Sequence, residues 1–180
     1  MFHIVGVTPE APSAAEALGG LPPEIEHDLT MQELASAWRT LNSAQEERVD
    51  LVALGNPHFS ADECSVLAKL CAGRHRHPDT AIVVTTHRKV QQLAEQRGDV
   101  ETLEAFGVKL VTDTCWCMLH EPVIPIKARV IMTNSGKYAH YAPGLTGREM
   151  RFGSLADCVA AASSGRAPQK LPAWLVEDAH

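Results

Sequence analysis

Side chains that could do chemistry gather just after short apolar runs of this chain. His58, Cys115 and Lys137 each follow such a run. The full set of candidate side chains is Thr8, Asn56, His58, Ser60, Cys115, Ser135, Lys137, Tyr138 and Cys158. An imidazole can move protons, a thiolate binds metal ions, and an ammonium group binds carboxylates. The set therefore predicts a small-molecule site, and an enzyme's site in particular.

The turn at 56–60 combines several of these groups. Ser60 opens the pattern Ser-Ala-Asp-Glu, a capping box that starts a helix, and a helix N-terminus also attracts anions. Asn56 and His58 on the same turn could bind a carboxylate or move a proton. A purely local hydrogen-bonding role for His58 accounts for the sequence equally well.

The stretch 133–141 is the densest in polar groups. Gly136 permits a tight turn after the preceding run, so that Ser135 and Lys137 would point at a bound ligand. Lys137 could then pair with a substrate carboxylate, and Tyr138 could add a hydrogen bond. A solvated turn with tyrosines packed beneath it is the alternative.

The five cysteines argue against a disulfide scaffold because their number is odd. Cys64 and Cys71 lie on the apolar stripe of an expected helix, where free cysteines are usually buried. Cys115 instead follows a strand, and Cys158 lies in the first turn of a helix opened by Ser154. The helix dipole lowers a thiol's pKa there, and a thiolate is what a metal or cluster needs. Core packing is the alternative for this pair.

Two other patterns are weaker indications of a metal site. Cys117 and His120 follow Cys115, but no second cysteine pair completes a structural zinc site. The run at 74–78, rich in Arg and His, follows Gly73 and is typical of a solvated basic turn at a helix end.

The elements that must position these groups alternate along the chain. Strands are expected at 2–7, 24–29, 49–55, 81–86, 108–113 and 129–133, with helices between them. This alternation predicts a three-layer α/β/α fold with a mainly parallel sheet. Ligands of such sheets bind at the carboxyl ends of the strands, so five of the strand exits would line one site.

The ends of the chain are expected to differ from this pattern. The region 8–23, rich in Ala, Pro and Gly, predicts a loop with one short helix. We expect one domain over residues 1–166 and a tail over 167–180, which Trp174 and Leu175 would dock onto it.

Composition narrows the class of protein. The 180 residues are 45% hydrophobic and 21% charged, as in ordinary globular chains. The net charge of −6 argues against general nucleic-acid binding. No apolar run approaches the roughly 20 residues of a membrane span, and no signal peptide is evident, so a cytoplasmic location is expected.

Several motifs, in order along nearly the whole chain, resemble the aconitase X family. The matching strings are Phe2–Ala11, Leu54–Ser60, Asp113-Thr114-Cys115, Thr133–Tyr141, and Gly153-Ser154 with Cys158 and Gly165. Each string alone is modest, and their ordered combination is specific. The family's archaeal members tend to have Cys where this chain has Asn56, so the Leu54–Ser60 string looks like the bacterial branch.

The resemblance implies a hydro-lyase that removes water from a small hydroxy-carboxylate, such as cis-3-hydroxy-L-proline or mevalonate 5-phosphate. It also implies an iron–sulfur cluster, 2Fe-2S or 4Fe-4S, held by three cysteines. Two ligands would be Cys115 and Cys158, and the third would lie in a segment that precedes this chain. A missing large-domain segment and a smaller swivelling domain or subunit would complete the enzyme, so the isolated chain would be inactive.

The other candidates would bind the substrate or take part in the reaction of such an enzyme, and the residue that removes the proton stays open. We expect catalytic roles for His58, Ser60 and Lys137. We expect substrate contacts from Thr8, Asn56, Ser135 and Tyr138.

Two other functions fit the residues without the resemblance. One is a Rossmann-like binding or scaffold domain, which the absence of a Gly-rich dinucleotide or P-loop motif disfavours. The other is a thiol enzyme in which Cys115 is the nucleophile and His58 or His87 the base.

Overall fold

A five-stranded parallel sheet forms the centre of the molecule. The computed structural model describes residues 2–168 and 170–176. The strands lie in the order β3-β2-β1-β4-β5, and each neighbouring pair is parallel. Their bounds are β1 Leu51–Phe59, β2 Ala81–Thr86, β3 Val108–Thr112, β4 Val130–Thr133 and β5 Glu149–Phe152. The expected strands at 49–55, 81–86, 108–113 and 129–133 are thereby confirmed.

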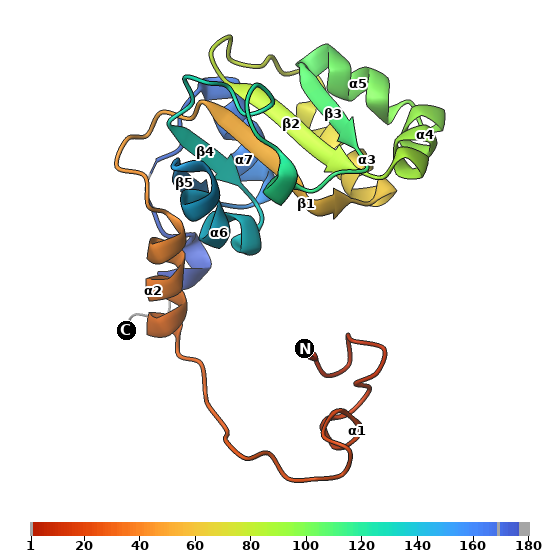
Figure 1. Cartoon of the computed structure of the whole chain (residues 1–180), viewed down its shortest axis with the longest axis vertical. Helices are drawn as coiled ribbons and strands as arrows, with labels where there is room; N and C mark the ends of the chain where they lie inside the picture. Colours follow the sequence, from red (N-terminus) through yellow and green to blue (C-terminus); the bar gives the residue numbers. More distant parts are fainter. Residues whose placement is uncertain (1, 169, 177–180) are drawn as a thin grey trace.

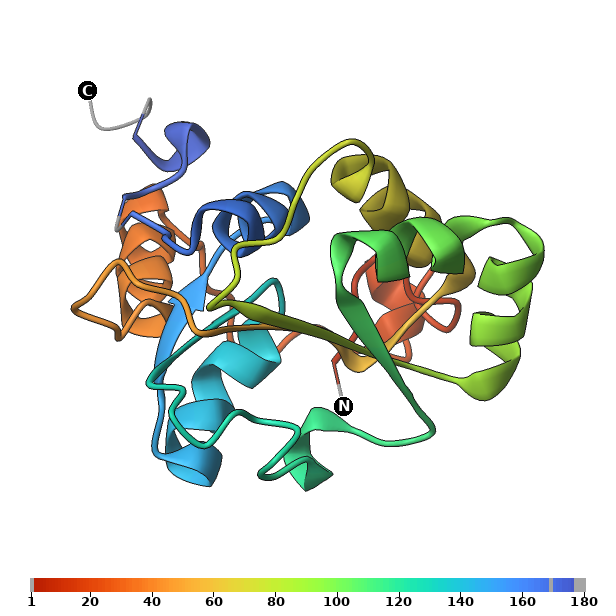
Figure 2. The same ribbon diagram turned by 90° about the horizontal axis from the view of Figure 1, so that it is seen from above.

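Helices cover both faces of this sheet (Figures 1 and 2). The α-helices are α1 Ala14–Ala17, α2 Met31–Leu41, α3 Ala61–Cys71, α4 Arg88–Gln96, α5 Asp99–Phe106, α6 Gly136–Thr146 and α7 Leu155–Ser164. Two short 3-10 helices, η1 Trp116–Met118 and η2 Ala173–Leu175, complete the described structure. The α/β class with a parallel sheet is confirmed.

The two faces of the sheet bury two separate cores. Val52 and Leu54 of β1 point into the core under α3, α5 and α7, whereas Leu51 and Ala53 point into the core under η1 and α6. This alternation is the strand's two-residue period. Burial on both faces explains why the strand sequences are continuously apolar rather than alternating.

The helix starts predicted at Ser60 and Ser154 are confirmed, and Thr30 starts a third helix in the same way. Thr30, Ser60 and Ser154 each accept a hydrogen bond from the N–H of the third helical residue, and the carboxylate of that residue accepts one from the backbone N–H of the cap. These boxes satisfy backbone donors that the first helical turn leaves free, and fix where each helix leaves the sheet.

The predicted strands at 2–7 and 24–29 are wrong. Residues 2–7 form turns in which Val7 N–H donates to the Ile4 carbonyl and Gly6 N–H to the Ala11 carbonyl. Residues 24–29 run as an exposed connection. A strand needs a neighbour to satisfy its backbone groups, and neither segment has one in the described structure.

The sequence pattern did not predict two of the elements, α6 and β5. The expected turn at Gly136 is instead the start of α6, which Ser135 caps and which continues past Pro143. The four residues of β5 include Glu149 and Arg151, so they lack an apolar run that would predict a strand. Both elements are short or carry helix-breaking residues, and tertiary packing decides them.

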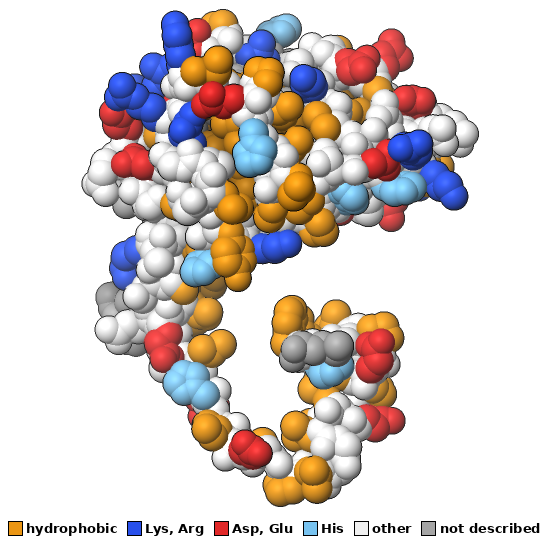
Figure 3. Space-filling view, viewed as in Figure 1, with side chains coloured by type: hydrophobic (Ala, Val, Ile, Leu, Met, Phe, Trp, Pro, Cys, Tyr) orange, Lys and Arg blue, Asp and Glu red, His pale blue; other side chains and the backbone are white. Residues whose placement is uncertain are grey.

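The two ends of the described chain behave differently. Residues 2–29 form an arm that extends away from the sheet and exposes apolar side chains, among them Phe2 and Ile25 (Figures 1 and 3). The C-terminal segment instead packs on the domain: Leu175 is buried, and Trp174 lies edge-on to Trp38, 6.1 Å between ring centroids. The docking predicted for Trp174 and Leu175 is thus observed. Across the described residues, no helix has the length and apolarity that crossing a membrane requires.

Candidate active site at the carboxyl edge of the sheet

The end of β1 is bent and held in place by its neighbour β2. The pairing register breaks between Leu54 and Phe59, and Gly55 has φ +80°. Hydroxyls of β2 hold the bend: Thr85 donates to the carbonyls of Gly55 and Pro57, and Thr86 donates to that of Phe59. The turn that carries Asn56 and His58 is therefore fixed by buried hydrogen bonds rather than left as a free loop.

Two contacts place this turn against the segment that follows β3. Trp116 Nε1 donates to the carbonyl of Leu54 over 2.7 Å, and His58 Nε2 lies 2.8 Å from the carbonyl of Thr114. The two segments thus run side by side in opposite directions. Asn56 and Cys115 lie in the stretches between these two contacts, so the two stretches are close at this edge of the sheet.

Asn56 has no hydrogen-bond partner for its side chain in the described structure. Both its amide nitrogen and its amide oxygen are buried and unpaired. An unpaired buried amide costs free energy, about 1–3 kcal/mol by mutational estimates. A polar ligand at this position would remove that cost.

Cys115, Cys117, Lys137 and Tyr138 share one electrostatic environment. Burial raises the pKa of the Cys117 thiol, a hydrogen bond with the Cys115 thiol raises it further, and the nearby Lys137 ammonium opposes both. Burial, followed by the charges of Cys117 and Cys115, raises the pKa of Tyr138. The Tyr138 hydroxyl therefore stays protonated, and it is buried without a hydrogen-bond partner in the described structure.

Two of the predicted serines already serve as helix caps. The Ser60 hydroxyl donates to Glu63 Oε2 over 2.8 Å, and Ser135 accepts from the N–H of Tyr138 over 3.2 Å. Both sit at the carboxyl edge, because α3 follows β1 and α6 follows β4. Lys137 is exposed on the first turn of α6.

Two predicted site residues lie elsewhere. Cys158 is fully buried in the core under α3 and α7, on the opposite face of the sheet from Trp116. Burial and then the charge of Asp157 raise the pKa of this thiol, the reverse of the shift expected from its place in the first helical turn. Thr8 lies on the N-terminal arm, where its hydroxyl accepts a hydrogen bond from Ile4 N–H.

Sequence reasoning missed two residues that position this site. Trp116 is 1% exposed, and the centroid of its ring lies 5.3 Å from that of Tyr138. It therefore joins the segment after β3 to α6 as well as to β1. Asp113 takes a positive φ of 59° and accepts hydrogen bonds from Arg88, which lower the pKa of its carboxyl group. The sequence did offer indications of both residues. Trp116 lies between two cysteines, and Asp113 lies two residues before the first of them.

The cysteines should separate into two classes by reactivity. Burial raises the pKa of Cys64 and Cys71 to about 11, and Cys158 is fully buried, whereas Cys115 and Cys117 are half-buried. The pKa of Cys117 is raised as well, so burial is what separates the two classes, and we expect a disulfide reagent at pH 8 to modify Cys115 and Cys117 first. The other three should react only after unfolding in denaturant. A third fast thiol in the native protein would contradict this assignment.

Comparison with known proteins finds a matching family and similar relatives. The family described as aconitase X third domain matches residues 49–164. A cis-3-hydroxy-L-proline dehydratase of Pseudomonas aeruginosa is 60% identical over 99% of this chain and 31% of its own length. A protein of the same name from Hypocrea jecorina is 54% identical over 97% of this chain and 30% of its own length.

A solved structure agrees with these sequence matches. Aconitase X of Thermococcus kodakaraensis, in its holo-form, superposes with a TM-score of 0.62 and 27% identity over 73% of this chain and 33% of that one. The chain thus spans about a third of the length of the relatives it matches.

Proposed function

Because this chain belongs to the aconitase X family, we propose that it forms part of a hydro-lyase that removes water from a small hydroxy-carboxylate, cis-3-hydroxy-L-proline in the first instance. The observation that carries the proposal is the contact between the turn of Asn56 and His58 and the segment of Cys115 at the carboxyl edge of the sheet. These two segments supply an unpaired buried amide, which a polar ligand could bind, and a half-buried thiol, which could bind a metal. The names of the two dehydratase relatives support the choice of substrate.

An iron–sulfur cluster fits this arrangement in part. Cys115 offers a half-buried thiol at the edge where the unpaired Asn56 amide lies. Among the residues that the structure describes, no three His, Cys, Asp or Glu side chains are grouped to hold a metal ion. We therefore propose Cys115 as one ligand, with further ligands from other parts of the enzyme. Cys158 would have to leave the core to bind a metal, and its ligand role stays a prediction.

The residues of this chain would then bind and orient the substrate. The Lys137 ammonium, on the first turn of α6, would pair with the substrate carboxylate. The protonated hydroxyl of Tyr138 and the amide of Asn56 would donate hydrogen bonds to substrate oxygens. A bound cluster would supply a Lewis-acidic iron for the leaving hydroxyl.

His58 is the proposed general base. The Thr114 carbonyl can only accept a hydrogen bond, so His58 Nε2 carries the hydrogen and Nδ1 keeps its lone pair. Nδ1 would take the proton next to the substrate carboxylate. Ser60, bound to Glu63, would hold the turn at the start of α3 rather than transfer a proton. The arm that carries Thr8 does not reach this edge in the described structure. The substrate contact of Thr8 therefore stays a prediction.

A chimeric enzyme tests the proposal. This chain would replace the matching region of the Pseudomonas aeruginosa relative, to which it is 60% identical. We expect the chimera to consume cis-3-hydroxy-L-proline, followed by proton NMR, and to leave mevalonate 5-phosphate unchanged. A folded chimera that consumes neither compound, or only the phosphorylated one, would refute the proposed substrate.

Replacing Lys137 in the chimera should weaken binding of the substrate anion. Lys137→Met removes a charge-assisted hydrogen bond, so kcat/KM should fall about 10- to 100-fold. Lys69→Met on the last turn of α3, at the far end from the carboxyl edge, is the matched control and should leave kcat/KM unchanged. Equal values of kcat/KM for the Lys137 and Lys69 variants would remove Lys137 from the site.

A further inference from the structure

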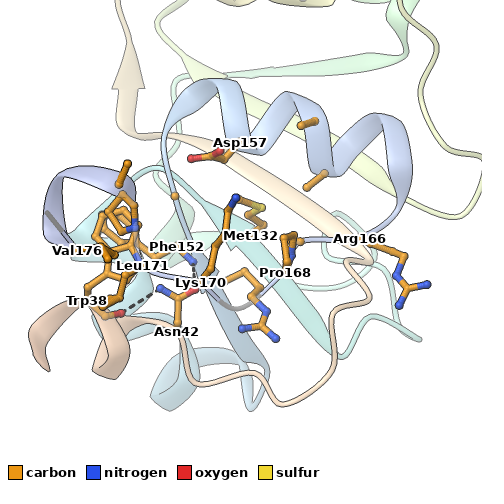
Figure 4. Close-up of a pocket in the computed structure, with 17 residues that line it drawn as sticks. Trp38, Asn42, Met132, Phe152, Asp157, Arg166, Pro168, Lys170, Leu171 and Val176 are labelled. Atoms are coloured by element: carbon orange, nitrogen blue, oxygen red, sulfur yellow. Dashed lines mark hydrogen bonds between the residues drawn. The ribbon is translucent and has the colours of Figure 1, made fainter. Parts of the chain in front are cut away.

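A second pocket, distinct from the Asn56–Cys115 site, lies between β5, α7, α2 and the C-terminal segment (Figure 4). Its volume is about 740 Å³, within the range of small-molecule sites. Trp38, Phe152 and Leu171 give it an apolar wall, and the rings of Trp38 and Phe152 pack 4.7 Å apart. It shares no lining residue with the Asn56–Cys115 site.

Arg151 is the unusual residue of this pocket. It lies on β5 beside Met132 of β4, and it is 1% exposed. Its Nη2 donates to the carbonyl of Glu46 over 2.8 Å, while Nε and Nη1 have no partner within the described structure. A guanidinium keeps its charge at neutral pH, and an uncompensated buried charge is strongly destabilising. The burial of Arg151 therefore calls for an anion.

The carboxylates around the pocket do not meet this need. Asp157 lines the pocket, but its Oδ2 is bound to the backbone and hydroxyl of Ser154 as part of the helix cap. Glu47 and Glu149 both lie near Arg151, but Glu47 pairs with Arg166 over 2.9 Å and Glu149 accepts a hydrogen bond from the N–H of Gln45. Lys170 adds another cation to the wall. The described lining thus holds one carboxylate, Asp157, and three cations, of which Arg166 is paired with Glu47.

We propose that this pocket binds a small organic carboxylate, whose anion accepts hydrogen bonds from Arg151 and whose apolar part packs on Trp38, Phe152 and Leu171. The cationic end and the apolar wall match an amphipathic molecule better than a bare inorganic ion. Because the charged end of the pocket, at Arg151 beside Met132 and α7, lies on the other face of the sheet from Trp116, the ligand would be an effector or a second bound acid, not the molecule that reacts.

Binding of hexanoate to the isolated chain tests this proposal, with Trp38 next to the pocket as a fluorescent reporter. We expect hexanoate to change the tryptophan emission and to bind at least tenfold more tightly than hexanamide, which has the same shape without the charge. Arg151→Met should weaken hexanoate binding at least tenfold. Arg97→Met, which removes a surface arginine paired with Asp62, is the control and should bind as the unmodified chain does.

A second variant covers the chance that Arg151→Met does not fold. Ala160 lines the pocket from the exposed side of α7, so Ala160→Phe should fill the pocket without disturbing the core, and should abolish hexanoate binding. Failure of the unmodified chain to bind hexanoate would overturn the proposal, as would equal binding by both pocket variants. The substitutions Glu177→Gln and Asp178→Asn remove two carboxylates near the end of the chain. If hexanoate bound only after these substitutions, a carboxylate of the chain itself would be the partner of Arg151, and the proposal would be overturned.

Discussion

Cys115→Ser in the chimeric enzyme is expected to remove the visible absorbance of an iron–sulfur cluster and to lower kcat by at least about 100-fold. Loss of a mere outer-shell partner of a metal costs about 10- to 100-fold, so loss of a ligand should cost no less. The prediction rests on the half-buried thiol of Cys115 and on the contact of its segment with the turn of Asn56 and His58. Absorbance between 300 and 500 nm, recorded on anaerobically purified protein, is the measurement.

Two other cysteines serve as controls for this experiment. Cys117→Ser removes a thiol that is hydrogen-bonded to Cys115 and equally half-buried, so it matches Cys115 in exposure. We expect it to keep the absorbance. Cys158→Ala should also keep it if the thiol stays in the core, and loss of absorbance there would show that Cys158 is a ligand. Full absorbance in the Cys115 variant would refute the assignment of Cys115.

Gly55→Ala is expected to destabilise the isolated chain by about 3–5 kcal/mol. Gly55 has φ +80°, and a Cβ atom there would overlap the carbonyl oxygen of Thr85 on the adjacent strand. A Cβ atom is fixed to the backbone of β1 and the Thr85 carbonyl is part of the backbone of β2, so neither can move without breaking the hydrogen bonds that hold the end of β1. The midpoint of urea unfolding, followed by circular dichroism, measures the loss.

The matched control for this variant is Gly144→Ala in α6. A Cβ atom at Gly144 meets nothing within 4 Å, and the residue has no positive φ. Alanine also suits a helix better than glycine, so stability should stay equal or rise by up to about 1 kcal/mol. Unfolding midpoints that coincide for the Gly55 and Gly144 variants would mean that the end of β1 is less constrained than described.

The sequence predicted the elements whose local pattern and packing agree. β2 and β3 are apolar runs of the expected length, and Thr30, Ser60 and Ser154 carry complete capping patterns. The error at 2–7 has a different cause, because an apolar run indicates burial but does not supply a neighbouring strand. The start of α6 was also unpredictable locally, since Gly136 and Pro143 oppose the helix that Ser135 caps.

The site could be predicted residue by residue but not as an arrangement. Asn56, His58 and Cys115 were recognisable by type and position, yet nothing local indicates that 54–58 runs against 114–116. That contact depends on Trp116, whose ring is buried across β1.

Cys158 illustrates the opposite case. Its helix position suggested a lowered pKa, whereas Leu155, Val159 and Ala162 form an apolar stripe with it that packs on the sheet. The same periodicity that placed Cys64 in the core applied to Cys158, and burial outweighs the helix dipole there.

The N-terminal arm has a practical consequence for handling this chain in solution. Its apolar side chains meet water rather than the sheet, with Phe2 81% and Ile25 85% exposed. Contiguous exposed apolar surface promotes self-association, so concentrated samples would tend to aggregate through the arm while the sheet itself stays intact. A version that begins at Thr30, the first cap of the packed structure, would keep both buried cores and would be the better starting point for crystallisation.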